Sequence, residues 1–87
     1  MTYDTKRRIL HTGVKEKVKL SRTEHFLLIC LSSGNVATYK EITKYLRIKQ
    51  TSLNSLRMRL NRKTKNQLKI KSIRGVGYIL ESEIYFE

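Results

Sequence analysis

The sequence has no proline, a single cysteine and no apolar run that approaches the ~20 residues needed to span a bilayer. Cys30 has no partner for an internal disulfide, so we expect a small core residue in an internal compartment. The basic N-terminal residues are followed by no apolar stretch of signal-peptide length. No repeat, low-complexity tract or linker interrupts the chain. Residues 1–87 therefore predict one continuous cytoplasmic domain without membrane contact.

Residues with the spacing of catalytic or metal sites are missing as well. His11, His25 and Cys30 do not have the spacing of metal ligands. The Gly75-Val76-Gly77 stretch lacks the strand-to-helix context of a phosphate-binding loop. We therefore expect a protein that is not an enzyme and that has no cofactor and no metal site.

Acidic residues are scarce, since 7 Asp and Glu stand against 19 Lys and Arg and give a formal net charge of +12. No acidic residue occurs from Ile42 to Leu80. A folded domain with a one-signed half attracts a polyanion, and nucleic acid is the commonest one. A membrane-surface helix would need a wide apolar face opposite its Lys and Arg residues, and no segment has one. The charge therefore favours nucleic acid over anionic lipid.

The first 20 residues predict a β-hairpin. Two short extended runs, Arg8–Leu10 and Lys17–Leu20, flank a connection that contains Gly13. Val18 and Leu20 alternate with lysines, as in a half-buried strand.

Two capping boxes predict two helices. Ser21–Glu24 precedes an apolar run that continues to Leu31, and Gly34-Asn35 can end this helix. Thr38–Glu41 opens a second, shorter helix, so both glutamates are expected to be structural acids rather than an acid/base pair. The residues expected to point inward from the second helix are Ile42, Tyr45 and Leu46.

A third helix is predicted after the short turn Arg47–Gln50, which completes a three-helix core over residues 21–63. Leu53, Leu56 and Leu60 fall at i, i+3 and i+7 and form one apolar stripe. The other faces of this helix are polar and basic. Two helices joined by a few residues, the second with such an outer face, are typical of a helix-turn-helix.

The stretch 68–80 predicts a second β-hairpin. The extended runs Leu68–Ile73 and Tyr78–Leu80 flank Arg74-Gly75-Val76-Gly77, whose glycines permit a tight turn. A basic hairpin directly after a recognition helix is a wing. The fold class expected is α+β, a winged helix-turn-helix with an N-terminal β-hairpin, three helices and a C-terminal hairpin wing.

Three segments resemble one family, the OmpR/PhoB-type winged-helix DNA-binding domains of bacterial response regulators. Ile70–Tyr78, with the sequence IKSIRGVGY, resembles the wing signature of that family. Leu56–Leu60 resembles the core of its recognition helix, and Leu20–Leu31 resembles the start of its first helix. The segments come in the family's order, and the resemblance covers the chain from about Arg7 to Leu80.

The resemblance implies that the third helix lies in the major groove of DNA and that the wing reaches the neighbouring minor groove. By position, Thr51, Asn54 and Ser55 would face the bases, while Ser52 and Arg57 would meet phosphate. The complete set of expected DNA-binding residues is Gln50, Thr51, Ser52, Asn54, Ser55, Arg57, Arg59, Arg62, Lys71, Ser72 and Arg74.

Two of these residues carry a specific chemical expectation. Arg74 matches a wing position near the minor groove, where a narrow groove has an enhanced negative potential that attracts arginine. Asn54 has an amide that can pair with both donor and acceptor of an adenine edge. Ser72 also matches a wing position that approaches the minor groove.

Several features depart from the family. No receiver domain precedes residue 1, so we expect either a fragment of a response regulator or a protein that works without phosphorylation. The family's first strand is missing or shortened before Tyr3. The loop between the second and third helices is much shorter, which leaves contact with RNA polymerase by that route open. The acidic and aromatic tail, residues 81–87, extends past the usual end and can add a strand or hold a partner.

The main hypothesis is therefore a transcription regulator that binds double-stranded DNA specifically, as a homodimer or in tandem on repeated half-sites. A non-specific, charge-driven nucleic-acid binder is the first alternative. A protein-interaction module that modulates a related regulator through Phe26, Ile29 or the tail is the second. If Phe26 and Ile29 pack under the N-terminal hairpin instead, they form no such surface.

Overall fold

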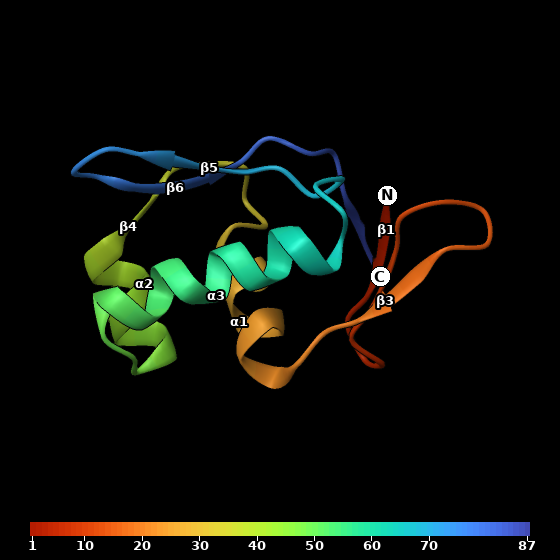
Figure 1. The fold of residues 1–87 in the computed structure, drawn as a ribbon, viewed down its shortest axis with the longest axis horizontal. Helices are drawn as coiled ribbons and strands as arrows, with labels where there is room; N and C mark the ends of the chain where they lie inside the picture. The colour runs from red at the N-terminus through yellow and green to blue at the C-terminus, as the bar shows by residue number, and fades with distance from the viewer.

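Three helices lie together at the left and centre of Figure 1, below the wing strands, and the first begins at the predicted capping box. The computed structural model describes all 87 residues. Helix α1 spans Arg22–Cys30. The Glu24 N–H donates to Ser21 Oγ over 3.2 Å, and the Ser21 N–H donates to Glu24 Oε1 over 2.7 Å. Both bonds satisfy donors that the first turn of a helix leaves free, so this box is confirmed.

Helices α2 and α3 form the predicted helix-turn-helix. In α2, Tyr39–Leu46, the Glu41 N–H donates to Thr38 Oγ1 over 3.2 Å, but no reciprocal bond forms, so Thr38 is a simple N-cap rather than half of a box. Arg47 ends the helix with a left-handed φ of 57°. After Ile48 and Lys49, α3 runs over Gln50–Lys63. The connection is therefore three residues long, as short as expected.

The hydrophobic core lies between the helices and the two sheets. The predicted leucine stripe of α3 is buried, together with Leu27, Leu28 and Leu31 of α1. Strand residues complete the core, among them Tyr3, Leu10, Leu20, Ile70 and Tyr78.

The expectation for Tyr45 is wrong, because this side chain is 54% exposed. Ile42 is the fully buried residue of α2, and Leu46 is half-buried. A helix of eight residues packs along one narrow stripe, and Tyr45 lies at its margin. Its ring meets the Phe26 ring edge-on, with centroids 5.8 Å apart.

Cys30 differs from the expectation, and Phe26 contacts α2. Cys30 is half-buried rather than a core residue, and with Ile29 and Tyr45 it lines an open hollow of about 300 Å³ between α1 and α2. Phe26 is half-buried in α1. Its ring contacts Tyr45, His25 and the Arg22 guanidinium, which lies 5.6 Å from the ring centre.

The N-terminal sheet has four strands in the order β3-β2-β1-β7. Its strands are β1 Thr2–Asp4, β2 Ile9–His11, β3 Lys17–Lys19 and β7 Tyr85–Phe86. The predicted hairpin forms β2 and β3, and a first strand is present but only three residues long. The tail adds β7, which pairs in parallel with β1. The two chain ends are thus side by side (Figure 1).

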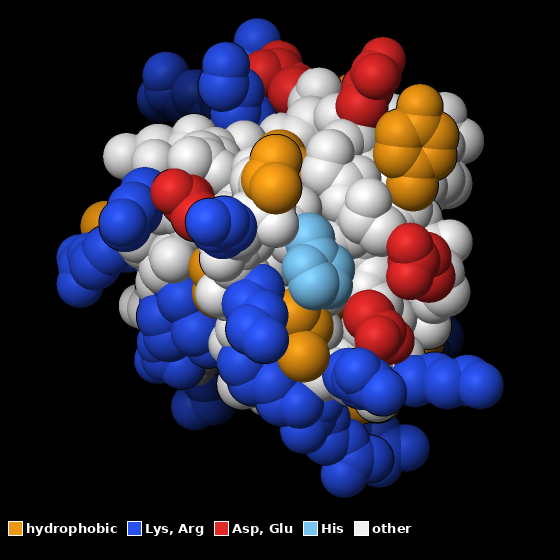
Figure 2. Space-filling model, turned by 90° about the vertical axis from the view of Figure 1, so that its right-hand side faces the viewer, with side chains coloured by type: hydrophobic (Ala, Val, Ile, Leu, Met, Phe, Trp, Pro, Cys, Tyr) orange, Lys and Arg blue, Asp and Glu red, His pale blue; other side chains and the backbone are white.

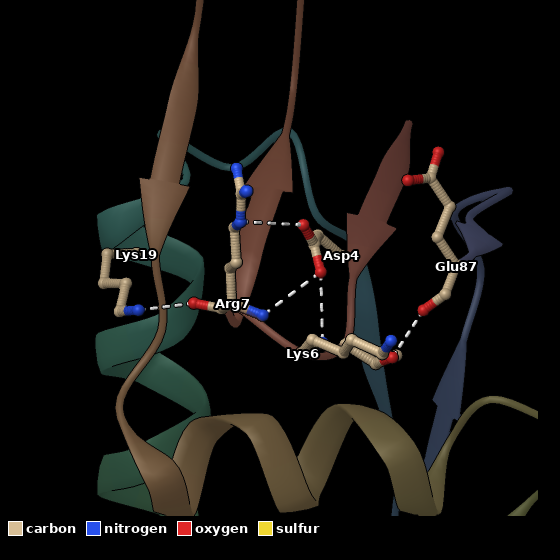
Figure 3. A network of polar contacts seen from close by, with 6 residues as sticks. Asp4, Lys6, Arg7, Lys19 and Glu87 are labelled. Atoms are coloured by element: carbon tan, nitrogen blue, oxygen red, sulfur yellow. Dashed lines mark hydrogen bonds and ion pairs between the residues drawn. The ribbon is translucent and has the colours of Figure 1, made fainter.

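Polar contacts fix the turn between β1 and β2 (Figure 3). Asp4 Oδ1 accepts from the N–H groups of Lys6 and Arg7, both at 3.1 Å. The Lys19 ammonium donates to the Arg7 carbonyl, and the Thr5 N–H donates to the Glu87 carbonyl over 3.2 Å. The last residue of the chain is therefore tied to the start of the first turn.

The wing sheet has three strands in the order β4-β6-β5. Strands β5, Ile70–Ile73, and β6, Gly77–Leu80, are the predicted wing hairpin. Strand β4, Ala37–Thr38, was not predicted; it pairs antiparallel with β6 directly before α2 begins. The expected winged helix-turn-helix is confirmed. Each of the three helices is too short and too polar to cross a membrane.

Candidate nucleic-acid interface

Helix α3 has a buried stripe and a broad exposed face. The stripe consists of Leu53, Leu56 and Leu60. With about 3.6 residues per turn, the line directly opposite the leucines carries Thr51, Ser55, Met58 and Arg62. The centre of the exposed face is therefore polar and free of acidic side chains.

One flank of α3 faces the wing and the other faces α1. The Arg57 guanidinium lies 5.5 Å from the centre of the Tyr78 ring in β6, which marks the wing flank. Lys63 Nζ lies 2.9 Å from Glu24 Oε1 in α1, which marks the other. By the same helical period, the wing flank also carries Gln50 and Asn54, and the α1 flank carries Ser52 and Arg59. The predicted residues of α3 thus occupy three adjacent strips of one helix.

All of the predicted DNA-binding residues are exposed except Arg57, which is half-buried. The Arg57 Nη2 group donates to Asn54 Oδ1 over 3.0 Å, and its Nε is buried without a partner. The guanidinium is thus held between α3 and the Tyr78 ring. One lone pair of Asn54 Oδ1 is occupied, and the second remains available.

A pair of aromatic rings fixes the wing against α2. The Tyr39 and Tyr78 rings meet edge to face, with centroids 5.3 Å apart. The Tyr39 hydroxyl forms a 3.0 Å hydrogen bond with Ser72 Oγ in β5. Ser72, a predicted wing contact, is therefore already held by the first residue of α2. These contacts set the position of the wing relative to the two helices.

The two glycines of the wing are required for different structural reasons. Gly75 has a φ of +74° in the turn that the Val76 N–H closes by donating to the Ile73 carbonyl. A Cβ on Gly77 would lie 1.9 Å from the Ala37 carbonyl oxygen, so only glycine permits β6 to approach β4. Arg74, beside the turn, is exposed.

The wing tip lies at the same end of the molecule as the start of α3 (Figure 1). An open hollow of about 570 Å³ separates them. Its lining includes Tyr39, Lys40, Thr43, Gln50, Gly75 and Val76. A single ligand that occupied this hollow would contact both helices and the wing.

Sequence reasoning missed several residues of this surface. Met58, 49% exposed, lies in the central line of α3, and Val76, 45% exposed, lies at the wing tip. The helical period contains the signal for Met58, because it places this residue directly opposite the leucine stripe. Lys40 and Thr43 had no such signal, because their place in the hollow depends on how α2 packs against the wing.

Few carboxylates lie near this surface. Lys71 Nζ is 3.8 Å from Glu81 Oε1, and both side chains are largely exposed, so solvent screens the pair. Glu24 is fully buried. Burial works to raise the pKa of Glu24, but hydrogen bonds from Lys63 and Ser21 outweigh it, so its pKa is lowered and the carboxylate stays charged. No group of three His, Cys, Asp or Glu side chains gathers anywhere in a form that could hold a metal ion.

Comparison with known proteins finds similar folds only among solved structures. No known family pattern and no curated protein sequence matches the chain. The C-terminal domain of the nisin resistance regulator NsrR, a lantibiotic response regulator, is 28% identical, with a TM-score of 0.73 and 86% of each chain covered. The DNA-binding domain of Bacillus subtilis CssR is 22% identical, with a TM-score of 0.72 over 84% of this chain and 90% of that one. The resemblance that the three sequence motifs carry is thus confirmed, and the chain has the winged-helix fold of the OmpR/PhoB-type response-regulator domains.

Proposed function

We propose that this chain binds double-stranded DNA in a sequence-specific manner and regulates transcription. One observation carries the proposal: the start of α3, at Gln50, and the wing tip border one hollow, and both elements belong to a stretch of sequence that contains no acidic residue. A surface of this kind suits a ligand that is both polyanionic and long enough to touch a helix and a hairpin together. The NsrR domain comes from a lantibiotic response regulator and the CssR domain is described as DNA-binding, which supports the same function.

We assign the roles of the α3 residues from their positions around the helix. The central line, with Thr51, Ser55 and Met58, would face base edges in the major groove, where the thioether can contact a thymine methyl group. Asn54 would pair with a base through its amide while Arg57 holds its orientation. Arg59, on the α1 flank, and Arg62, at the C-terminal end of the central line, are exposed and would meet phosphates.

The wing would supply the second set of contacts. Arg74 extends from the hairpin turn and would enter the minor groove, and Lys71 and Ser72 would contact the adjacent backbone. Arg57 acts mainly as a positioning residue in this scheme, since its guanidinium is occupied by Asn54 and Tyr78. We expect two copies of the chain on repeated half-sites, as a homodimer or in tandem.

The experiment that tests this proposal is selection from a random pool of duplex DNA, repeated at two salt concentrations. We expect an enriched motif that survives the higher salt, with a spacing between its halves that reveals how two copies bind. Uniform recovery that vanishes with salt would instead identify a charge-driven binder.

Three variants then assign the contacts on the selected duplex. We expect Arg74→Ala to weaken binding by about tenfold and Asn54→Ala to change the base preference at one position. Arg7→Ala is the matched control, because Arg7 is exposed on the N-terminal sheet and its removal changes the charge equally. Equal affinity and preference for all three variants would contradict the assigned contacts.

A protein-interaction module remains the second candidate because of the hollow between α1 and α2. Ile29 and Ile42 line it, and the exposed Tyr45 ring forms part of its wall. This function would be favoured if no duplex were recovered at either salt concentration.

A further inference from the structure

A second basic hollow lies at the opposite end of α3 from the wing tip. It has a volume of about 380 Å³ and is open to solvent. The loop between β2 and β3 and the start of β3 form one wall, with Lys15 and Lys17, and the end of α3 and the turn after it form the other, with Lys63 and Lys65. Four lysines thus line one concave surface, which we call the lysine hollow.

The charge of the lysine hollow is largely unbalanced. Lys63 is paired with Glu24, but Lys15, Lys17 and Lys65 take part in no ion pair. One carboxylate, Glu16, also lines the hollow and accepts a hydrogen bond from the Thr12 hydroxyl over 3.4 Å, so the lysines outnumber the acidic groups. Several like charges held in one concavity produce a positive potential that attracts an anion with several charges.

The lysine hollow continues the basic surface of α3. Arg59 and Lys63 lie on the same flank of the helix, one turn apart, and Lys65 follows directly. In Figure 1 the β2–β3 loop projects beyond the C-terminal end of α3, along the long axis of the molecule. Figure 2, which views this end, shows Lys and Arg side chains along the left and lower margins, while acidic side chains lie mostly at the top and right.

The length of α3 indicates what the lysine hollow would meet. A helix of 14 residues is about 21 Å long, whereas the major groove is about 12 Å wide. If the N-terminal part of α3 lies among the bases and the helix crosses the groove, its C-terminal end lies at a phosphate strand that borders the groove. The lysine hollow would then be next to that strand.

We propose that the lysine hollow binds the DNA phosphate backbone beyond the bases that α3 reads, on the side away from the wing. This inference rests on the proposed function and adds a contact made by the N-terminal sheet. Lysines contribute charge without base selectivity, so this contact strengthens binding to any sequence and increases its salt dependence. An acidic segment of a protein partner could match the same charge, but it would not account for the continuity with α3.

The test compares the 87-residue chain with the variant Lys15→Gln/Lys17→Gln on the selected duplex and on a random-sequence duplex, each over a series of salt concentrations. Each lost phosphate contact makes the negative slope of log K against log salt less steep by ~0.9. We therefore expect the slope of the double variant to be less steep by about 2 on both duplexes. Lys6→Gln, in the exposed turn between β1 and β2, is the control and should leave the slope unchanged. Thermal unfolding checks that the variants are folded, as surface changes of this kind permit.

Shortening the duplex provides a second measurement. Removing half a helical turn from the side that the lysine hollow contacts should weaken wild-type binding and leave the double variant unaffected.

An unchanged slope in a variant that still selects the wild-type motif would overturn the lysine hollow as a DNA contact while leaving the proposed function intact. Poly-glutamate serves as the probe for an acidic protein segment. If the double variant bound poly-glutamate less well than the wild type but bound DNA equally well, the proposed DNA contact would be overturned in favour of an acidic protein partner. Failure of the wild type to bind any duplex would contradict the proposed function itself.

Discussion

The wing sheet and the N-terminal sheet are attached to the three helices in different ways. The wing sheet is held by contacts from α2 and α3, through the Tyr39 and Tyr78 rings and the Arg57 guanidinium. The N-terminal sheet is held by the two ends of the chain. The Tyr85 N–H donates to the Met1 carbonyl over 2.9 Å, and the Glu87 N–H donates to the Tyr3 carbonyl over 2.8 Å.

The two sheets also differ in charge. Residues 70–80 of the wing contain no acidic residue, with Glu81 at the base of the wing paired with Lys71, whereas Glu83 and Glu87 flank β7 in the tail. An acidic group at the wing would repel the polyanion that we propose as ligand, but the same group on the tail side would have little effect on binding. We therefore expect the wing sheet to form part of the proposed binding surface and the tail side of the N-terminal sheet to serve stability.

The largest effect is expected from Gly77→Ala, which tests the attachment of the wing sheet. The added Cβ would lie 1.9 Å from the Ala37 carbonyl oxygen, so β4 and β6 would have to separate. We expect a loss of about 3 kcal/mol in the free energy of unfolding, measured by urea denaturation, together with weaker DNA binding.

Gly75→Ala is the control for this prediction. A Cβ on Gly75 would meet nothing within 4 Å. The substitution would therefore lower stability only through the backbone strain of an alanine at a φ of +74°. We expect a loss of about 1 kcal/mol. Equal losses for the two glycines would mean that the close approach of β4 and β6 does not constrain the wing.

The wing could be predicted from the sequence because its determinants are local. Its strands are separated by a single Gly-containing turn, and the leucine stripe of α3 has a clear helical period. Strand β7 could not be assigned in the same way, since its pairing joins Thr2 to Tyr85 from opposite ends of the chain. Strand β4 has only two residues and forms because β6 lies beside it.

The candidate site was predictable to a similar extent. The exposure of the α3 face follows from the position of the leucines, and the exposed turn of the wing follows from its glycines. The packing of Arg57 on Tyr78 depends on the distance between α3 and β6, which no local pattern contains. The lysine hollow likewise brings residues 15 and 17 next to residues 63 and 65, although neither segment indicates the other.

The second prediction concerns the ion pair that joins α1 to α3, the helices to which the two sheets are attached. In Lys63→Met the fully buried Glu24 carboxylate would lose its closest cation, although the Ser21 N–H bond would remain. We expect a loss of about 2 kcal/mol at neutral pH, because an uncompensated buried charge is costly.

The pH dependence separates this pair from a general charge effect. Because the folded-state pKa of Glu24 is lowered, its contribution is present above the unfolded pKa of 4.5 and is lost as the pH falls through the folded value. Lys63→Met should reduce this acid-dependent part of the stability. Arg62→Met, which removes an exposed charge next to it, should change stability by less than about 0.5 kcal/mol and keep the pH profile.

A third prediction tests the attachment of the N-terminal sheet through β7. Phe86 packs edge-on against the buried Tyr3 ring, with centroids 5.9 Å apart, whereas the Tyr85 side chain is 71% exposed. We expect Phe86→Ala to lower the free energy of unfolding by about 2 kcal/mol and Tyr85→Ala to lower it by less than about 0.5 kcal/mol. Where both variants are folded, DNA affinity should equal that of the wild type. A loss of DNA affinity in folded Phe86→Ala would contradict the separation of the two regions.

The smallest effect is expected from His25, which joins α1 to the N-terminal sheet. Its Nδ1 lies 2.6 Å from the Tyr3 hydroxyl. Burial raises the pKa of Tyr3 to about 12, so the hydroxyl stays protonated at neutral pH and can donate to a neutral imidazole.

The direction of the pH effect follows from the pKa of His25. Burial lowers this pKa below the usual 6.5, with a further contribution from the charge of Arg8. The unfolded chain therefore binds a proton more readily than the folded one, and stability falls as the pH drops below 6.5 towards the folded value. We expect the Tm of the wild type to fall slightly between pH 7 and pH 5.5. His25→Gln should remove most of this change, whereas His11→Gln, at an exposed position of β2, should retain it. If His25→Gln kept the full pH dependence, protonation would act elsewhere, and the Tyr3–His25 contact would be no more than packing between α1 and β1.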